Sequence, residues 1–401
     1  MDARFIQETL RRETEKEVKD NILKFWSDKS VDEKNGGFLG SIENDLSVDF
    51  EAPKGSVLNT RILWTYSKAY NIFKEEKYLK LAKRAYDFIK ESLWDADYGG
   101  LFWMVDYRGN PLNTKKQIYA QAFGIYALSE YYIATKNPES LEYAIKLYRA
   151  IEQYSHDKEN KGYFEACTRE WEPTEDLQLG AGDMNEKKSM NTHLHILEAY
   201  TNLYRIWKDE DLKGQFEELI KITIDYIIDP ETYHFKLFFD ERWNSKSGVI
   251  SYGHDIEGSW LLVEAAEVLG DKNLLKRTKE IACSMAQKVY EQGIDEAGAV
   301  MNEMLEDGSL DVDRIWWVQA EAVVGFMNAY EMTGKSHFLE AAYNTWNFIK
   351  EYVVDKKDGE WFWSVDKTGE PNNKYLKVDP WKCPYHNSRA CFEVIERMTN
   401  K

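Results

Sequence analysis

Residues 99–111 read Gly-Gly-Leu-Phe-Trp-Met-Val-Asp-Tyr-Arg-Gly-Asn-Pro, and residues 359–371 repeat this pattern as Gly-Glu-Trp-Phe-Trp-Ser-Val-Asp-Lys-Thr-Gly-Glu-Pro. Shorter copies of the same glycine–aromatic turn occur at Gly36-Gly37-Phe38, Gly162-Tyr163-Phe164 and Gly298-Ala299-Val300, with Tyr233-His234-Phe235 as a weaker member that lacks the glycine. Neighbouring copies lie about 60–70 residues apart, and such a period predicts one structural unit per copy. The sequence therefore predicts six units.

The segments between these turns carry apolar residues at helical spacing. One such stripe consists of Leu79, Ala82, Ala85, Tyr86 and Ile89. Two helices per unit give about twelve helices, in which short links alternate with longer loops. We therefore predict an all-α fold of the (α/α)6 barrel class, a toroid of six helical hairpins with short β-hairpins in the long loops of one face. No linker or low-complexity segment interrupts it, so we predict a single domain over residues 1–401.

The composition excludes several classes of function. The net charge of −18 argues against nucleic-acid binding, which needs clustered Lys and Arg. No apolar stretch approaches the ~20 residues of a membrane helix, and the first residues lack a signal-peptide pattern. Four scattered cysteines without a Cys-x-x-Cys pair fit reduced thiols and no structural zinc. We expect a cytoplasmic protein that binds neither nucleic acid nor membrane.

The aromatic content is unusually high, with 14 Trp, 25 Tyr and 18 Phe. These residues could form a large aromatic core, or they could line a cleft in which ring faces stack on the C–H faces of sugars. Composition alone does not choose between the two.

The inner helices of the toroid should follow the long loops, beginning near residues 53, 114, 187, 254, 313 and 385. Their first turns carry polar and aromatic side chains: Asn59 and Arg61; Lys116, Tyr119 and Gln121; Asn191, His193 and His195; His254, Glu257 and Trp260; Trp316, Trp317 and Glu321; and His386 and Arg389 just after Trp381. Six segments that present such groups at the same end of a ring predict an active site at that end.

Helical spacing sharpens this prediction. Asn191 and His195 share a helix face, whereas His193 and His195 point about 200° apart, so one of them faces the cavity and the two cannot chelate a metal together. His254 and Glu257 are three residues apart, which allows the carboxylate to orient the imidazole and stabilise its charged form. The position of His254 at the start of a helix favours the neutral imidazole instead. No phosphate-binding loop, Gly-x-Ser-x-Gly or His-Glu-x-x-His motif is present. We expect neither a metal nor a cofactor.

Other candidates have simpler interpretations. His156, His234 and His337 fit structural roles. Arg61 could belong to a buried structural ion pair, and one of Trp316 and Trp317 should pack in the core.

Four motifs carry a family resemblance. They are residues 189–195 (Ser-Met-Asn-Thr-His-Leu-His), 251–257 (Ser-Tyr-Gly-His-Asp-Ile-Glu), 316–321 (Trp-Trp-Val-Gln-Ala-Glu) and 381–386 (Trp-Lys-Cys-Pro-Tyr-His). In this order, they resemble the cellobiose 2-epimerase family of the N-acylglucosamine 2-epimerase superfamily, and the resemblance spans essentially the whole chain. It implies an (α/α)6 barrel that converts the reducing-end glucose of a β-1,4-linked disaccharide, such as cellobiose or lactose, into mannose without a metal or nucleotide.

The resemblance also implies roles for individual residues. His254 and His386 resemble the acid/base pair of the family, and His195 resembles its third catalytic histidine. Arg61, Tyr119 and Asn191 match positions that hold the oxygens of the reacting sugar. Glu257 and Glu321 would tune the histidines and bind hydroxyls, Trp317 would stack on the reducing-end ring, and Trp381 on the second sugar. The expected partner is a small oligosaccharide, and we expect a monomer.

The chemistry accounts for these residue types. Once the sugar ring opens to an aldehyde, a base with a pKa near 7 can remove the C2 proton and an acid can return it to the other face. Imidazole suits both tasks, and Arg61 could stabilise the enediolate intermediate. The same intermediate allows slow aldose–ketose isomerisation.

Several alternatives remain open at the level of sequence. An inverting glycoside hydrolase on the same toroid would use two carboxylates about 6.5–9.5 Å apart, drawn from Glu257, Glu321 and Asp255, but would leave the histidines without a role. An N-acylglucosamine 2-epimerase, a monosaccharide aldose–ketose isomerase and a non-catalytic sugar-binding toroid are the others.

Overall fold

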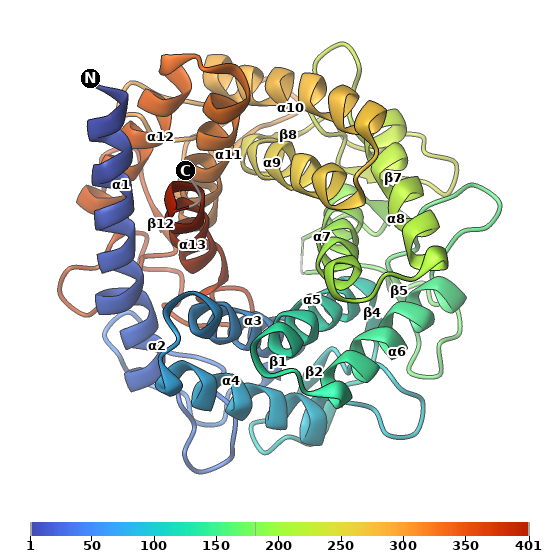
Figure 1. The fold of residues 1–401 in the computed structure, drawn as a ribbon. Helices are drawn as coiled ribbons and strands as arrows, with labels where there is room; N and C mark the ends of the chain where they lie inside the picture. The colour runs from blue at the N-terminus through green and yellow to red at the C-terminus, as the bar shows by residue number, and fades with distance from the viewer. Residues whose placement is uncertain (1, 181, 400–401) are drawn as a thin grey trace.

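The computed structural model describes residues 2–180 and 182–399, and it arranges them as two concentric rings of helices (Figure 1). The inner ring consists of α3 (Ser56–Phe73), α5 (Ile118–Thr135), α7 (Met190–Ile206), α9 (Tyr252–Leu269), α11 (Trp316–Thr333) and α13 (Tyr385–Thr399). The outer ring consists of α1 (Ala3–Glu17) with α2 (Leu23–Lys29), α4 (Glu76–Phe88), α6 (Pro138–Tyr154), α8 (Glu210–Ile222), α10 (Lys272–Gln292) and α12 (Ser336–Phe348). The predicted (α/α)6 barrel is confirmed.

Four π-helical turns extend outer helices: η1 (Val18–Ile22), which joins α1 to α2, η2 (Ile89–Leu93), η3 (Thr223–Ile227) and η4 (Ile349–Val353). The last three follow α4, α8 and α12 directly and lead into the glycine–aromatic turns.

The ring is closed by the two ends of the chain. Each inner helix packs against the next, and α13 packs against α3. Each inner helix also packs against the outer helix that follows it, except that α13 packs against α1, from the other end of the sequence. The sixth helical hairpin is therefore assembled from the first and last helices of the described chain.

The two rings differ in the pattern of buried residues. In α4, Tyr78, Ala82 and Ala85 are buried on one face, as expected for an amphipathic outer helix. In α5, every residue from Ile118 to Tyr131 is buried, because outer helices, neighbouring inner helices and the ring centre surround it. The inner helices carry polar side chains despite this burial, so each of these side chains needs a partner.

Short strands lie in the long loops, where the sequence predicted β-hairpins. They are β1 (Lys54–Gly55), β2 (Met104–Val105), β3 (Pro111–Asn113), β4 (Lys116–Gln117), β5 (Ala166–Cys167), β6 (Lys188–Ser189), β7 (Phe238–Phe239), β8 (Ile250–Ser251), β9 (Glu303–Met304), β10 (Leu310–Asp311), β11 (Arg314–Ile315) and β12 (Ser364–Val365). A strand that leads into an inner helix pairs antiparallel with the strand after the next outer helix, as β1 does with β2 (Lys54 opposite Val105) and β11 with β12 (Arg314 opposite Val365). These pairings join the two ends of five of the six helical hairpins. Four inner helices begin three or four residues later than predicted, because strand residues precede them.

Each repeated turn opens with an aspartate whose Oδ1 accepts hydrogen bonds from backbone N–H groups that follow it. These are Asp32, Asp95, Asp157, Asp229, Asp295 and Asp355. Among the described residues, five of these six aspartates also form an ion pair with a lysine or arginine from the strand or loop before an inner helix. The pairs are Lys54–Asp32, Lys116–Asp95, Lys188–Asp157, Arg314–Asp295 and Lys377–Asp355. These pairs were not predicted from the sequence. Lys116 was expected among the polar groups at the active-site end of the ring, but its side chain is fully buried and pairs with Asp95.

The glycines of the turns are required by the backbone. Gly100 has a φ of +74°, and a Cβ there would lie 2.5 Å from Cζ2 of Trp171. In the fourth turn, Tyr233 adopts a φ of +62° without a glycine, which explains why this copy looked weaker in the sequence.

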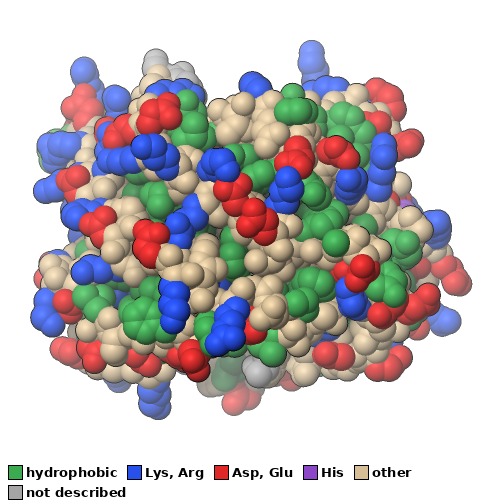
Figure 2. Space-filling model, turned by 90° about the horizontal axis from the view of Figure 1, so that it is seen from below, with side chains coloured by type: hydrophobic (Ala, Val, Ile, Leu, Met, Phe, Trp, Pro, Cys, Tyr) green, Lys and Arg blue, Asp and Glu red, His purple; other side chains and the backbone are tan. Residues whose placement is uncertain are grey.

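The outer surface mixes charges of both signs. On the face shown in Figure 2, acidic and basic side chains are interspersed, with hydrophobic side chains between them. This face lacks the continuous basic surface that a phosphate backbone requires. Within residues 2–180 and 182–399, no helix combines the length and the apolar character needed to cross a bilayer.

Candidate active site

A cavity of about 200 Å³ lies at the N-terminal ends of the inner helices. Its lining consists of Arg61, Tyr119, Asn191, His195, His254, Glu257, Trp316, Trp317, Trp363, Trp381 and His386. Nine of the ten residues that the sequence assigned to the site are in this lining, and the tenth, Glu321, hydrogen-bonds to the ring of His386. Trp316 is buried in the hydrophobic core, as expected for one of the two tryptophans, although both Trp316 and Trp317 contribute to the cavity lining.

Helical phase decides which side chains reach the site. The sixth residues of α3, α7, α9 and α11 are Arg61, His195, Glu257 and Glu321. The fourth residues of four inner helices face the loops instead and bond the backbone of a repeated turn: Gln121 at Leu101, His193 at Tyr163, Asp255 at Phe235 and Gln319 at Val300. Two residues apart is about 200° on a helix, so the two sets point in opposite directions.

His193 and His195 illustrate this division. Nε2 of His193 accepts a hydrogen bond from the N–H of Tyr163 at 2.9 Å, and Nδ1 lies 2.7 Å from the carbonyl of Ser189. Burial lowers the pKa of His193 to about 3, so it is a neutral structural residue. His195 lies in the cavity wall, with its ring against Tyr119 and Phe123 at centroid distances of 4.9 and 4.7 Å.

His254 is held differently from the prediction. Its Nδ1 lies 2.8 Å from Oγ of Ser251, and its ring lies 4.7 Å from that of Trp317. Glu257 does not orient this imidazole, because its carboxylate turns toward Arg389. Burial, with a smaller contribution from His195, lowers the pKa of His254 to about 3. His254 is therefore neutral, as its position near a helix start favoured, and is not stabilised as a cation by Glu257.

His386 is bound to Glu321. Its Nδ1 lies 2.8 Å from Oε1 of Glu321 and 3.9 Å from Oε1 of Glu257. Oε1 of Glu321 also accepts a hydrogen bond from Arg389 at 2.6 Å, so Nδ1 of His386 carries the proton and Nε2 keeps its lone pair. Burial, then Arg61 and Arg389, hold the pKa of His386 well below its usual value.

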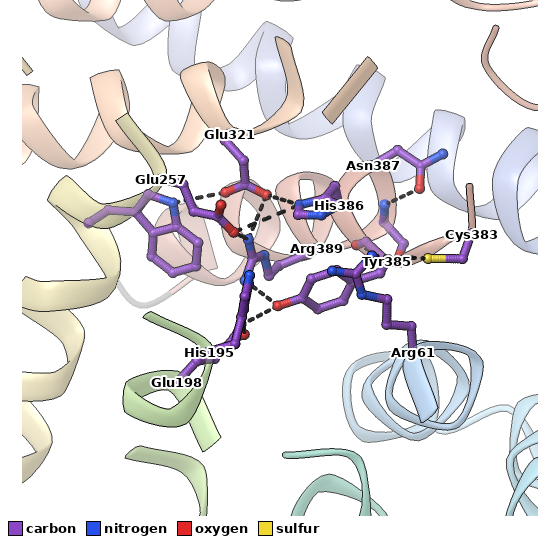
Figure 3. A network of polar contacts seen from close by, with 12 residues as sticks. Arg61, His195, Glu198, Glu257, Glu321, Cys383, Tyr385, His386, Asn387 and Arg389 are labelled. Carbon is purple, nitrogen blue, oxygen red and sulfur yellow. Dashed lines mark hydrogen bonds and ion pairs between the residues drawn. The ribbon is translucent and has the colours of Figure 1, made fainter. Parts of the chain in front are cut away.

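Arg389 is the centre of the network beneath the cavity (Figure 3). Its guanidinium donates hydrogen bonds to Glu198, Glu257, Glu321 and the hydroxyl of Tyr385. Arg389 was expected in the first turn of the sixth inner helix without an assigned role, and Glu198 was not predicted as a site residue. The available signal was the spacing of Glu198, which lies three residues after His195 on the same helix.

The three carboxylates around Arg389 differ in protonation. Burial would raise the pKa of Glu198, but Arg389, His195 and Tyr385 together lower it to about 2. Burial raises the pKa of Glu257 to about 7, with a further contribution from Glu321. Burial also raises the pKa of Glu321, against the effect of Arg389. Glu198 is therefore the ionised partner of Arg389, while Glu257 holds a proton part of the time at neutral pH.

One group near the cavity has the donor atoms of a metal site. Atoms of Glu257, Glu321 and His386 lie within 4.8 Å of one another. However, Nη2 of Arg389 is hydrogen-bonded to Oε1 of both glutamates, so a guanidinium already provides the positive charge at this position. The arrangement does not fit a metal ion.

Arg61 has a different environment from Arg389. It is 3% exposed and donates to the hydroxyl of Tyr119 at 2.7 Å and to Sγ of Cys383 at 3.9 Å. No carboxylate of the described residues forms an ion pair with it, so the alternative of a structural ion pair was wrong. Asn191 is similar, because its buried Oδ1 lines the cavity without a hydrogen-bond partner.

Four tryptophans, Trp316, Trp317, Trp363 and Trp381, line the cavity. Trp363 packs against Trp316 at a centroid distance of 4.6 Å and stacks on the exposed ring of Tyr375 at 5.1 Å. Across the cavity, Trp381 packs against Trp103 and Tyr119 at 5.9 and 5.8 Å. Partly exposed aromatic faces beside a polar cavity suit a sugar.

Fold and site together define the class: a helical toroid whose polar cavity is lined by three histidines, an arginine and several aromatic rings. Residues 37–390 match the family model of N-acylglucosamine 2-epimerase, and the chain belongs to this family of carbohydrate epimerases.

Close relatives cover nearly the whole chain. The cellobiose 2-epimerase of Bacteroides fragilis is 46% identical over 390 residues, which are 97% of this chain and 100% of the relative. The solved structure of cellobiose 2-epimerase from Bacillus thermoamylovorans is 43% identical, with a TM-score of 0.94 over 97% of this chain and 100% of that one. The N-acylglucosamine 2-epimerase of Bos taurus is 24% identical, over 98% of this chain and 93% of the relative.

Proposed function

We propose that this chain is a cellobiose 2-epimerase, which converts the reducing-end glucose of β-1,4-linked disaccharides, cellobiose and lactose among them, into mannose. The observation that carries the proposal is the convergence of His195, His254, His386 and Arg61 on one small cavity. The similarity to cellobiose 2-epimerases along the whole chain supports the same substrate class.

In the proposed reaction, two histidines act on the opened sugar. His254 or His386, as a neutral imidazole, takes the proton from C2 of the aldehyde form, and the electrons of the C–H bond move into an enediolate. The other histidine first takes up a proton from water and then, as imidazolium, returns it to the opposite face, while the base releases its proton to water. Both imidazoles are neutral at rest, as a base must be.

The remaining site residues hold and polarise the sugar. His195, held by Glu198, assists ring opening, and Arg61 donates to the oxygen on which the enediolate charge develops, a contribution typically worth about 3–4 kcal/mol for one donor. Tyr119 and Asn191 bind the neighbouring oxygens. Trp317 stacks on the reducing-end ring and Trp381 on the second sugar.

The hydrolase alternative fits this geometry poorly. Glu257 and Glu321 share the guanidinium of Arg389 and have atoms within 4.8 Å of each other, which leaves no room between them for the attacking water of an inverting hydrolase. Asp255 turns away and pairs with His234 at 2.6 Å. A sugar-binding toroid without catalysis would not need three histidines around the cavity.

We also propose one catalytic domain and a monomer. The packing of α1 against α13 supports one domain, because both ends of the chain complete the same ring. Light scattering after size exclusion tests the monomer.

The direct test is incubation of the protein with cellobiose and chromatography of the products. Glucosyl-mannose with a small amount of glucosyl-fructose is the expected result. Glucose as the main product would favour a hydrolase instead. N-acetylglucosamine and free mannose, offered separately, test the two remaining epimerase and isomerase alternatives.

A further inference from the structure

Arg61 is a buried cation that lacks a counter-ion. An unpaired buried charge is costly, and native proteins usually compensate it with an opposite charge. Arg389, about equally buried, has three carboxylates around it. Arg61 has none among the described residues, and its Nε has no hydrogen-bond partner.

The groups around Arg61 are neutral. Its guanidinium lies over the rings of Phe123 and Tyr385, at 4.3 and 4.8 Å from their centroids. Burial raises the pKa of the Tyr119 phenol and of the Cys383 thiol, so both hydrogen-bonding partners are uncharged at neutral pH. The positive charge of Arg61 is therefore left for the contents of the cavity that it lines.

We infer that the cavity binds aldonates, the sugar acids with a carboxylate at C1, and that Arg61 makes it prefer them to the corresponding neutral open-chain sugars. This inference rests on the proposed sugar chemistry of the site. It adds a ligand class that would inhibit the enzyme by occupying the place of the substrate.

The chemistry of the ligand matches the site in two ways. An aldonate is permanently open, so it needs no ring opening, and its planar carboxylate carries charge on the oxygens of C1, as the enediolate does. A guanidinium recognises a carboxylate through paired N–H donors, which a neutral hydroxyl group cannot match. The stacking surfaces of Trp317 and Trp381 would hold the rest of the molecule.

The test compares three ligands that differ only at C1. Cellobionate carries a charged planar group, cellobionamide a neutral planar group, and cellobiitol a neutral tetrahedral carbon. Isothermal titration of the wild-type protein at about pH 7.5, where the sugar acid is ionised, should give a Kd for cellobionate roughly 10- to 100-fold lower than for cellobiitol. Cellobionamide should bind like cellobiitol.

Two variants test the role of the arginine. Arg61→Gln should remove the preference for cellobionate, so that its Kd values for cellobionate and cellobiitol lie within about threefold of each other. Arg108→Gln changes the net charge equally on an exposed turn, and it should preserve the preference. Equal affinity of the wild-type protein for cellobionate and cellobiitol would overturn the inference, as would equal affinity for cellobionate and cellobionamide or an equal loss of preference in both variants.

This result is separable from the proposed function. A protein that epimerises cellobiose but binds the three ligands equally would refute only the aldonate site. A protein that prefers cellobionate through Arg61 but leaves cellobiose unchanged would refute only the epimerase.

Discussion

Oε2 of Glu198 lies 3.0 Å from Nδ1 of His195, one helical turn further along α7. Oε1 of the same carboxylate accepts hydrogen bonds from Arg389 and Tyr385. Because Glu198 is ionised, it fixes the proton of His195 on Nδ1, so that Nε2 carries the lone pair in this residue of the cavity wall.

Glu198→Gln should therefore lower kcat by roughly 10- to 100-fold with a small change in KM, because the amide can present its N–H₂ to the ring and allow the other tautomer. Steady-state kinetics on cellobiose measure the change, and circular dichroism checks the fold. Glu210→Gln is the matched control, because the side chain of Glu210 is exposed at the start of α8. Unchanged kcat in Glu198→Gln would remove Glu198 from the mechanism.

The histidines should separate into two groups. His254→Ala and His386→Ala should each lower turnover by about 10²–10⁴-fold while the fold persists. His193→Ala leaves the N–H of Tyr163 unpaired, so it should cost about 1–3 kcal/mol of the free energy of unfolding and change kcat little. Urea unfolding and initial rates on the same samples distinguish the groups. An active His254→Ala enzyme would contradict the assignment.

The pKa of Glu257, raised to about 7, predicts a dependence of stability on pH. Between about pH 4.5 and 7, this carboxyl keeps its proton in the folded state but loses it on unfolding, so rising pH favours unfolding. In Glu257→Gln this contribution is absent. The difference in free energy of unfolding, wild type minus variant, should fall by up to about 1.4 kcal/mol per pH unit over this range. Urea titrations at several pH values measure it; a difference that rises with pH would show that Glu257 is ionised in the native protein.

Gly253 limits the position of Trp317. A Cβ at residue 253 would lie 2.6 Å from Cη2 of Trp317 and 2.6 Å from Cγ2 of Val318. Gly253→Ala should therefore displace the indole beside His254 and weaken transition-state binding by about 1–3 kcal/mol. This loss corresponds to a decrease of roughly 10- to 100-fold in kcat/KM. Gly214→Ala, in open space on α8, is the control. If overcrowding is the cause, the smaller ring of Gly253→Ala/Trp317→Phe should give a higher kcat/KM than Gly253→Ala alone.

The sequence was sufficient to predict the toroid because its units repeat. The turns at Gly99 and Gly359 have the same pairing in the structure, with Val105 opposite Pro111 and Val365 opposite Pro371. Local repetition fixes local structure, and six copies of a helical hairpin leave few ways to bury their faces other than a closed ring.

The partners of the site residues were harder to predict. The spacing of His254 and Glu257 suggested a bonded pair, yet the structure forms that pair with the same spacing at His195 and Glu198. Spacing only places two side chains on one face of a helix. Arg389, which comes from a different helix, determines the orientation of each carboxylate. Residues that are so far apart in the sequence form no local pattern from which their contact could be predicted. The buried Lys–Asp pairs were missed for the same reason.

The source of the proton at C2 gives the most direct test of the proposed mechanism. Imidazole protons exchange with water, so cellobiose converted in D₂O should yield glucosyl-mannose with deuterium at C2. The enediolate also accepts a proton at C1, which gives the ketose, so a slow ketose by-product should carry deuterium at C1. Nuclear magnetic resonance of one reaction mixture reads both positions. A hydrolase would leave C2 untouched in every product, and a transient oxidation at C2 would return the original hydrogen. Epimer that retains protium at C2 throughout the reaction would exclude catalysis by solvent-exchanging histidines and would leave His254 and His386 without their proposed roles.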